Sequence, residues 1–265
     1  MARIVLENVS AVFPIYSRPS RSLRNRVFAA TTGGRIGKDR RKKTVVRALD
    51  DISLTIEHGD RVALMGANGA GKSTLLRVMS GIYEPISGRI VREGRVAPLF
   101  NASLGMERED TGYENIVNRG LFMGLRRDEI EARVDEIAEF TGLGEYLNMP
   151  IHTYSAGMRT RLAFAVCTSI EPDILLLDEG IGTGDAAFVQ RANERMKKMI
   201  EVTGILVLAS HSLGLLRRMC TTAIWMEAGK IVERGPLEDI IAGYYKSHNI
   251  PAGADDIDEA ETLAT

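Results

Sequence analysis

Eight residues in the first third of the chain have the types and spacing that bind phosphate. Positions 66–73 read G-A-N-G-A-G-K-S, after the apolar run 61–65 and before apolar residues at helical spacing. The glycines let the backbone curl so that its N–H groups face phosphate oxygens, Lys72 reaches the β- and γ-phosphates, and the Ser73 hydroxyl is a ligand for Mg²⁺. We expect a nucleoside triphosphate to be held by Gly66, Asn68, Gly69, Ala70, Gly71, Lys72, Ser73 and Thr74.

Two carboxylates end a second apolar run, 173–178, about 105 residues after the loop. Asp178 is expected to hold Mg²⁺ or its water, and Glu179 to act as the general base on the attacking water, a role worth about 10²–10⁴ in rate. A solvated turn is the alternative for two acids at a strand end. Together with the phosphate loop, they favour an enzyme that hydrolyses a nucleoside triphosphate.

Composition restricts the class of protein further. The 265 residues are 45% hydrophobic and 26% charged, which suits one large or two small globular domains. The net charge of -1 gives no reason to expect a nucleic-acid partner. The cysteines, Cys167 and Cys220, are too few for a disulfide framework and suit reduced packing residues. Because no apolar run approaches the roughly 18–20 residues that span a bilayer, we expect a cytoplasmic chain that meets a membrane only through a partner.

The elements expected around these residues alternate between strands and helices. Strands are expected at 3–13, 48–56, 61–65, 173–178, 205–210 and 222–227, and helices after residue 71 and at 128–140, 156–170 and 186–202. This order predicts an α/β fold with a mainly parallel sheet covered on both faces.

Two segments stand apart in charge. Between Arg18 and Lys43 there are ten Lys or Arg residues and one acid, around a possible short basic helix at 21–30. This is either a solvated insertion or an element that meets lipid headgroups, a membrane partner or an anionic substrate. The stretch 251–265 has five acids and no base, which predicts a flexible tail.

The motif Y-S-A-G-M at 154–158 narrows the family. It resembles the L-S-G-G-Q signature of ATP-binding cassette (ABC) ATPases, and it opens the helix expected at 156–170. Ser155 and the Gly157 amide would form a second phosphate cradle at the helix N-terminus, although a Ser-x-Gly before a helix is commonly only an N-cap. In ABC proteins this cradle covers the γ-phosphate bound by a second copy. The resemblance therefore implies a head-to-tail dimer that sandwiches ATP and Mg²⁺.

The resemblance implies roles for three further residues. His211, after the run 205–210, stands where ABC ATPases place the switch histidine that contacts the γ-phosphate. Asp185 matches the loop that communicates across the dimer, and it also suits the N-cap of the helix at 186–202. Phe13 would stack on adenine, with Tyr16 as its competitor. An aromatic residue in an early strand is as often part of the core.

Longer stretches are similar to the ATPase subunits of bacterial exporters for O-antigen, capsule and teichoic-acid-type polymers. They are 154–188, T-G-Y-E-N-I at 111–116 and I-W-M-E-A-G-K-I-V-E-R-G at 224–235, and G-D-A-A-F at 184–188 is the most discriminating. The resemblance implies an ABC-type P-loop NTPase with an N-terminal antiparallel β-subdomain. We expect an ATPase domain at 1–250 with a basic insertion at 17–44 and a helical subdomain at about 103–170, and the tail at 251–265.

This resemblance also implies partners and a place in the cell. The chain would work with an integral-membrane permease at the cytoplasmic face of the bacterial inner membrane, contact lipid-linked polysaccharide indirectly, and use 97–125 as the socket for a permease helix. Two departures stand out. The stretch 97–110 has no glutamine to sense the metal, so Asn101 is expected to take that place. Some O-antigen ATPase subunits continue into a β-sandwich that binds sugar, and we expect this chain to carry none.

Other functions stay open at this point. One is an ABC ATPase for another exported cell-envelope polymer, teichoic acid among them. A soluble ABC ATPase that acts on ribosomes or DNA would need a second cassette or a long coiled coil, and the sequence has neither. A regulatory module that only binds nucleotide would need neither Glu179 nor His211.

Overall fold

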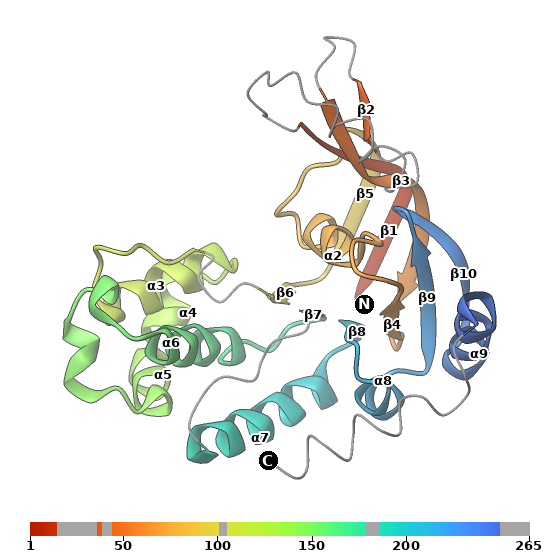
Figure 1. The fold of residues 1–265 in the computed structure, drawn as a ribbon. Helices are drawn as coiled ribbons and strands as arrows, with labels where there is room; N and C mark the ends of the chain where they lie inside the picture. Colours follow the sequence, from red (N-terminus) through yellow and green to blue (C-terminus); the bar gives the residue numbers. More distant parts are fainter. Residues whose placement is uncertain (15–35, 39–43, 101–104, 179–185, 250–265) are drawn as a thin grey trace. The chain divides into compact units, whose positions relative to one another are not determined.

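The computed structural model describes residues 1–14, 36–38, 44–100, 105–178 and 186–249. The chain divides into two compact units, coloured along the sequence in Figure 1. The helix-rich unit contains Met1–Ala2 and Gly94–Leu206, and the strand-rich unit contains Arg3–Glu93 and Val207–Thr265.

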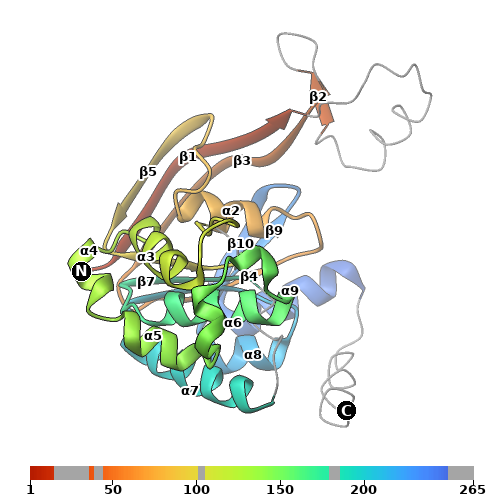
Figure 2. The same ribbon diagram turned by 90° about the vertical axis from the view of Figure 1, so that its left-hand side faces the viewer.

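An antiparallel sheet occupies the N-terminal part of the strand-rich unit, where its long strands run alongside one another in Figure 2. Its strand order is β2-β3-β1-β5, formed by β1 (Arg3–Pro14), β2 (Ile36–Lys38), β3 (Thr44–Glu57) and β5 (Ser87–Glu93). Along β1, Ile4, Leu6 and Val9 are buried, and the register with β3 shifts between Leu6 and Val9. This sheet is the antiparallel β-subdomain that the family resemblance implies.

The rest of the strand-rich unit positions the phosphate loop. Strand β4 (Arg61–Met65) pairs in parallel with β9 (Thr222–Glu227), and β9 pairs in antiparallel with β10 (Lys230–Pro236). Its helices are α2 (Lys72–Met79), α8 (Leu213–Met219) and α9 (Leu237–His248). Val62, Ala63 and Leu64 are fully buried, as expected for a parallel strand covered on both faces.

The helix-rich unit combines a parallel strand pair with a group of helices. Strand β6 (Val96–Leu99) pairs in parallel with β7 (Ile174–Asp178). The helices are α3 (Gly112–Phe122), α4 (Arg127–Glu131), α5 (Val134–Thr141), α6 (Ala156–Thr168) and α7 (Ala186–Val202), with short 3₁₀ turns η1 (Gly144–Asn148) and η2 (Ile151–Thr153). Strand β8 (Ile205–Ala209) crosses the boundary between the units and is buried throughout. The α/β fold with parallel strand pairing is thus confirmed.

The main difference from the expected elements concerns the helix at 128–140. The structure has two helices there, α4 and α5, separated at Ala132 and Arg133. The Arg133 side chain donates a hydrogen bond to the carbonyl oxygen of Ser169, so a tertiary contact favours the break over a continuous helix. Helices α3 and α9 were not expected from the sequence. Strand β2, which lies inside the basic insertion, was not expected either.

Part of the expected organisation lies outside the described residues. This holds for the possible helix at 21–30, most of the insertion 17–44 and the tail 251–265. Within the portions of chain that the structure describes, no helix combines the length and the apolar character needed to cross a membrane.

Candidate nucleotide site

The phosphate loop joins β4 to α2 and has a backbone that requires glycine. Gly66, Gly69 and Gly71 have φ angles of 136°, 79° and 113°, which L-residues with side chains rarely adopt. A Cβ atom at Gly66 would overlap the carbonyl oxygen of Met226, and one at Gly71 would lie 2.8 Å from that of Ala48. Two of the glycines are therefore required by close packing as well as by φ.

A neighbouring turn supports this loop through the backbone. The Gly229 N–H donates to the carbonyl oxygen of Ala70 at 2.9 Å, and the Asp50 N–H donates to the carbonyl oxygen of Gly229 at 2.9 Å. The Arg47 guanidinium, through a hydrogen bond at 2.6 Å, is the main cause that lowers the pKa of Asp50. These contacts connect the loop to β3 and to the β9–β10 turn.

The N-terminus of α2 suits an anion. Its N-cap is Gly71, which has no side chain to accept from the first-turn N–H groups, and the first turn contains no acidic residue. The positive end of the helix dipole and these N–H donors are the usual binding groups for phosphate. Among the loop residues, Ala70 is buried, Ser73 and Thr74 are half-buried, and Asn68 and Gly69 are exposed.

Lys72 lies in the first turn of α2 and is only 9% exposed. Its ammonium group donates to the carbonyl oxygens of Gly66 and of Ala67, the second at 3.3 Å. The side chain is therefore folded back over the loop, where it brings a positive charge to the phosphate cradle.

Two further candidates lie at strand ends. Asp178 is the last residue of β7, half-buried after four buried residues, in the helix-rich unit. His211 follows β8 in the strand-rich unit and is exposed, and the Ser212 N–H beside it donates to the Ser210 hydroxyl at 3.0 Å. Glu179, Asp185, Asn101 and Tyr16 lie outside the described residues.

The signature-like motif forms the start of α6. Ser155 is its N-cap and accepts a hydrogen bond from the Met158 N–H at 3.2 Å, and the first turn has no acidic residue. A Cβ atom at Gly157 would have only the Ser155 hydroxyl within 4 Å, at 3.9 Å. Among the described residues, packing therefore does not require glycine at 157.

Phe13 lies near the end of β1 and is half-buried. Its ring meets that of Tyr83 edge to face, with centroids 5.1 Å apart, and the Arg77 guanidinium lies 5.8 Å from the Tyr83 ring. Part of the Phe13 ring is thus used in packing and part is accessible. Its role in stacking on adenine stays a prediction.

Two of the residues singled out in the sequence have side chains of the kind that Mg²⁺ binds. Ser73 offers a hydroxyl and Asp178 a carboxylate, the hard oxygen ligands that Mg²⁺ prefers, and Mg²⁺ usually takes its other ligands from water and phosphate. Within the described ranges, no group of three or more His, Cys, Asp or Glu side chains could hold a metal ion alone.

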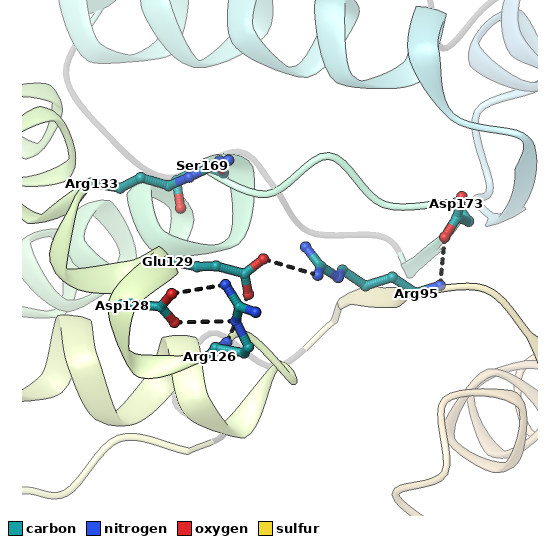
Figure 3. Close-up of polar contacts among 7 residues, drawn as sticks. All are labelled: Arg95, Arg126, Asp128, Glu129, Arg133, Ser169 and Asp173. Carbon is teal, nitrogen blue, oxygen red and sulfur yellow. Dashed lines mark hydrogen bonds and ion pairs between the residues drawn. The ribbon is translucent and has the colours of Figure 1, made fainter.

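Three arginines that the sequence did not single out bind the C-terminal ends of α2 and α6. Arg92 donates from Nε to Met79 and from Nη2 to Val78, both at 2.7 Å, and burial lowers the pKa of its guanidinium, while the charge of Glu84 raises it. Arg195 donates to the Thr168 carbonyl oxygen at 3.1 Å, and Arg133, beside Ser169 in Figure 3, donates to the carbonyl oxygen of that residue. Their partners lie 13 to 36 residues away, so no local pattern indicates them.

Comparison with known proteins places this geometry in a family. The family model described as "ABC transporter" matches residues 49–182. The O-antigen export system ATP-binding protein RfbE of Yersinia enterocolitica is 47% identical over 88% of this chain and 98% of its own length. The O-antigen export system ATP-binding protein RfbB of Klebsiella pneumoniae is 35% identical over 91% of this chain and 96% of its own length.

A solved structure supports the same fold. It is a dimeric, post-hydrolysis state of the ATP-binding cassette MJ0796 bound to ADP and Pi, which matches 88% of this chain and 98% of its own with a TM-score of 0.62 at 20% identity. On these similarities, and with its glycine-rich loop at the start of α2, the chain belongs to the ABC transporter family, among the ATP-binding proteins of O-antigen export systems.

Proposed function

We propose that this chain hydrolyses ATP with Mg²⁺ to drive export of a lipid-linked polysaccharide of the O-antigen kind across the cytoplasmic membrane. The observation that carries the hydrolytic part is the start of α2. Its first turn has no side-chain cap and contains the buried Lys72. The export part is supported by the names of the relatives, which are 35–47% identical over most of this chain.

In the proposed reaction the loop N–H groups and Lys72 hold the β- and γ-phosphates and stabilise the charge that develops on them. Glu179 accepts a proton from water as the water oxygen bonds to the γ-phosphorus and the bond to the β–γ bridging oxygen breaks. His211 donates to a γ-phosphate oxygen. Ser73 and Asp178 would hold Mg²⁺, which supplies further charge neutralisation.

A second copy of the chain is proposed to complete each site. Ser155 and the Gly157 N–H lie at the start of α6, where the dipole and the exposed backbone suit a phosphate. The open space beside Gly157 supports an approach from outside the unit. The fold neighbour described above is a dimer bound to ADP and Pi, which is the arrangement we propose here.

The proposed permease site is an exposed apolar stripe on α3. Tyr113 is 37% exposed and Leu121 41%, and with half-buried Val117 they follow the i, i+4, i+8 spacing of one helix face. Phe122, 54% exposed, extends this stripe. A short amphipathic helix of an integral-membrane partner fits such a surface and would keep the chain at the cytoplasmic face of the membrane.

The test is purification of the chain with its membrane partner and measurement of phosphate release with and without lipid-linked glycan. We expect the glycan to raise turnover, and Glu179→Gln to bind ATP, lose turnover and form a dimer on size-exclusion chromatography. Lys72→Ala should abolish the stabilisation by Mg-ATP, about 2.7 kcal/mol at a ligand concentration 100-fold above Kd. Val202→Ala, an exposed change at the end of α7, is the control.

Each part of the proposal has its own contrary result. Turnover that no glycan affects, with no permease retained, would reject the export role and leave a soluble ATPase. An unchanged thermal shift in Lys72→Ala would reject the loop assignment. A Glu179→Gln protein that stays monomeric with normal turnover would reject the proposed base and dimer.

A further inference from the structure

We propose that Arg133 and Arg195 are positioning residues for ATP hydrolysis. By binding the last carbonyl oxygens of α6, they fix where its first turn meets the γ-phosphate held by a second copy. The inference rests on the proposed function, since it assigns the anchor of the helix that would complete the site.

The evidence begins at the C-terminal end of α6. The carbonyl groups of Thr168 and Ser169 have no partner further along the helix, because α6 ends at Thr168. Arg195 of α7 donates to Thr168, and Arg133, the N-cap of α5, donates to Ser169. Two guanidinium groups from two other helices thus bind successive carbonyl groups at one helix end.

Arg195 connects three helices at once. Its Nη2 donates to Glu136 of α5 at 2.7 Å, its Nε donates to Thr168 of α6 at 3.1 Å, and its guanidinium lies 4.5 Å from the Phe140 ring. The side chain is only 18% exposed. The planar fork of arginine makes these contacts together, which a lysine ammonium on a flexible stem would not reproduce.

An aromatic cluster holds the middle of the same helix. Phe164 of α6 lies 6.2 Å from Phe140 of α5 and 6.0 Å from Phe188 of α7, measured between ring centroids. The body of α6 is therefore packed against both neighbours, and the arginines bind its distal end.

The other helix expected to face phosphate is also bound by arginine at its C-terminal end. The last turn of α2 is bound by Arg92 of β5 at Met79 and Val78, while its first turn has neither an acidic residue nor a side-chain cap. Two helices in two different units thus share arginine at the C-terminal end and a first turn without an acidic residue, although Ser155 caps α6 and no side chain caps α2. This recurrence favours a common requirement over incidental packing.

The effect acts through position, not through long-range charge. Thirteen helical residues span about 20 Å, which is about twice the Debye length of ~10 Å at 0.1 M salt. The charge of Arg195 is therefore largely screened at Ser155. A tilt of roughly 5° about the far end moves the tip of such a helix by about 2 Å, and a 1 Å misplacement can cost about 10²-fold in rate.

The test uses the full chain with Arg195→Lys, which keeps the charge and loses the fork. Arg191→Lys is the matched control. Arg191 lies one turn earlier on α7, and its guanidinium is 5.7 Å from the same Phe140 ring. Within the described part of the chain, Arg191 makes no hydrogen bond or ion pair of the kind that Arg195 makes. We measure kcat, KM, the Kd of a fluorescent ATP analogue, and the thermal midpoint. We expect Arg195→Lys to lower kcat about 10-fold or more with Kd within 2-fold of wild type, and Arg191→Lys to leave both within 2-fold.

The alternatives are separable. Equal kcat in Arg195→Lys and Arg191→Lys would overturn the inference, as would a parallel loss of kcat and nucleotide affinity, which indicates general destabilisation. If Arg195→Lys does not fold, Arg133→Lys is compared with Arg126→Lys, and the same two criteria apply. Arg126 is a suitable control because its guanidinium makes an exposed ion pair with Asp128 (Figure 3). A wild-type chain without turnover would instead reject the proposed function.

Discussion

The carbonyl oxygen of Ala48 lies so close to Gly71 that a Cβ atom there would be 2.8 Å away from it. Gly71 is also the N-cap of α2 with a φ of 113°, so both its backbone angle and its surroundings exclude a side chain. The position at which the phosphate-facing helix begins is therefore fixed by contact with β3 as well as by the loop itself.

This contact predicts that Gly71→Ala destabilises the chain more than Gly59→Ala. Gly59 has a similar φ of 99°, but a Cβ atom there would meet nothing within 4 Å. Both changes incur the backbone strain of about 1–2 kcal/mol, and only Gly71→Ala adds a packing cost of about 1–3 kcal/mol. Urea unfolding of the two variants measures the difference. Equal losses would show that the loop can move away from Ala48.

Gly157→Ala is expected to separate stability from turnover. Among the described residues, the added methyl group would meet only the Ser155 hydroxyl, at 3.9 Å, and alanine is favoured over glycine in a helix by about 0.5–1 kcal/mol. The same methyl group would obstruct a phosphate at the start of α6, so ATP turnover should fall. Gly243→Ala in α9 is the control, because its Cβ has only an ordinary contact with Glu233 at 3.5 Å. Normal turnover in Gly157→Ala would argue against the second cradle.

Asn115→Ala should cost about 3 kcal/mol. The Asn115 side chain is fully buried, accepts from the Glu107 N–H at 2.7 Å, and donates to the carbonyl oxygens of Glu107, Asp110 and Thr111. Its loss removes these partners of the Glu107 N–H and carbonyl oxygen inside a buried site, while the carbonyl oxygens of Asp110 and Thr111 keep the backbone N–H donors of Ile151 and residue 115.

Asn118→Ala is the matched control for this change. Asn118 is exposed on the same helix and donates to one Asp110 carboxylate oxygen at 2.7 Å, so its loss should cost under about 1 kcal/mol. Chemical unfolding measures both. A similar cost for the two variants would mean that the loop before α3 holds its shape without Asn115.

Alkaline pH is expected to weaken the fold through Cys220. Burial raises the pKa of this thiol from 9.0 to about 12, while the charge of Arg61 lowers it. The unfolded chain then loses the thiol proton first, so the contribution is fully present below pH 9 and is lost as the pH rises toward 12.

The free energy of unfolding should therefore fall by about 1.4 kcal/mol per pH unit above the unfolded pKa because of Cys220 alone. The measurement is the difference between wild type and Cys220→Ala at pH 8 and pH 10, which cancels the other titrating groups. If this difference does not change with pH, the thiol is more accessible to water than its burial indicates.

The phosphate loop could be predicted because its chemistry is local. A curled backbone, a lysine and a hydroxyl within eight residues require only the strand before and the helix after, and both patterns are visible from 61 to 79. The strands β7, β8 and β9 were predicted for a similar reason, since continuous apolar runs are typical of parallel strands covered on both faces. Glu179, Asp185 and Asn101 remain predictions, because they lie outside the described residues.

Other features depend on contacts between distant segments. The break between α4 and α5 follows from Arg133 binding Ser169, 36 residues away, which helical periodicity at 128–140 does not reveal. The partial burial of the Phe13 side chain is another such feature. Phe13 of β1 packs against Tyr83, which belongs to the segment that follows α2.

The sequence by itself determined which residues are suited to bind phosphate and metal and which elements carry them, because loop chemistry and hydrophobic periodicity are properties of neighbouring residues. Only the tertiary structure decided that Arg92, Arg133 and Arg195 bind the far ends of α2 and α6. A carbonyl group at a helix end accepts from any donor that the fold brings within reach, so its partner is set by packing and not by spacing along the chain.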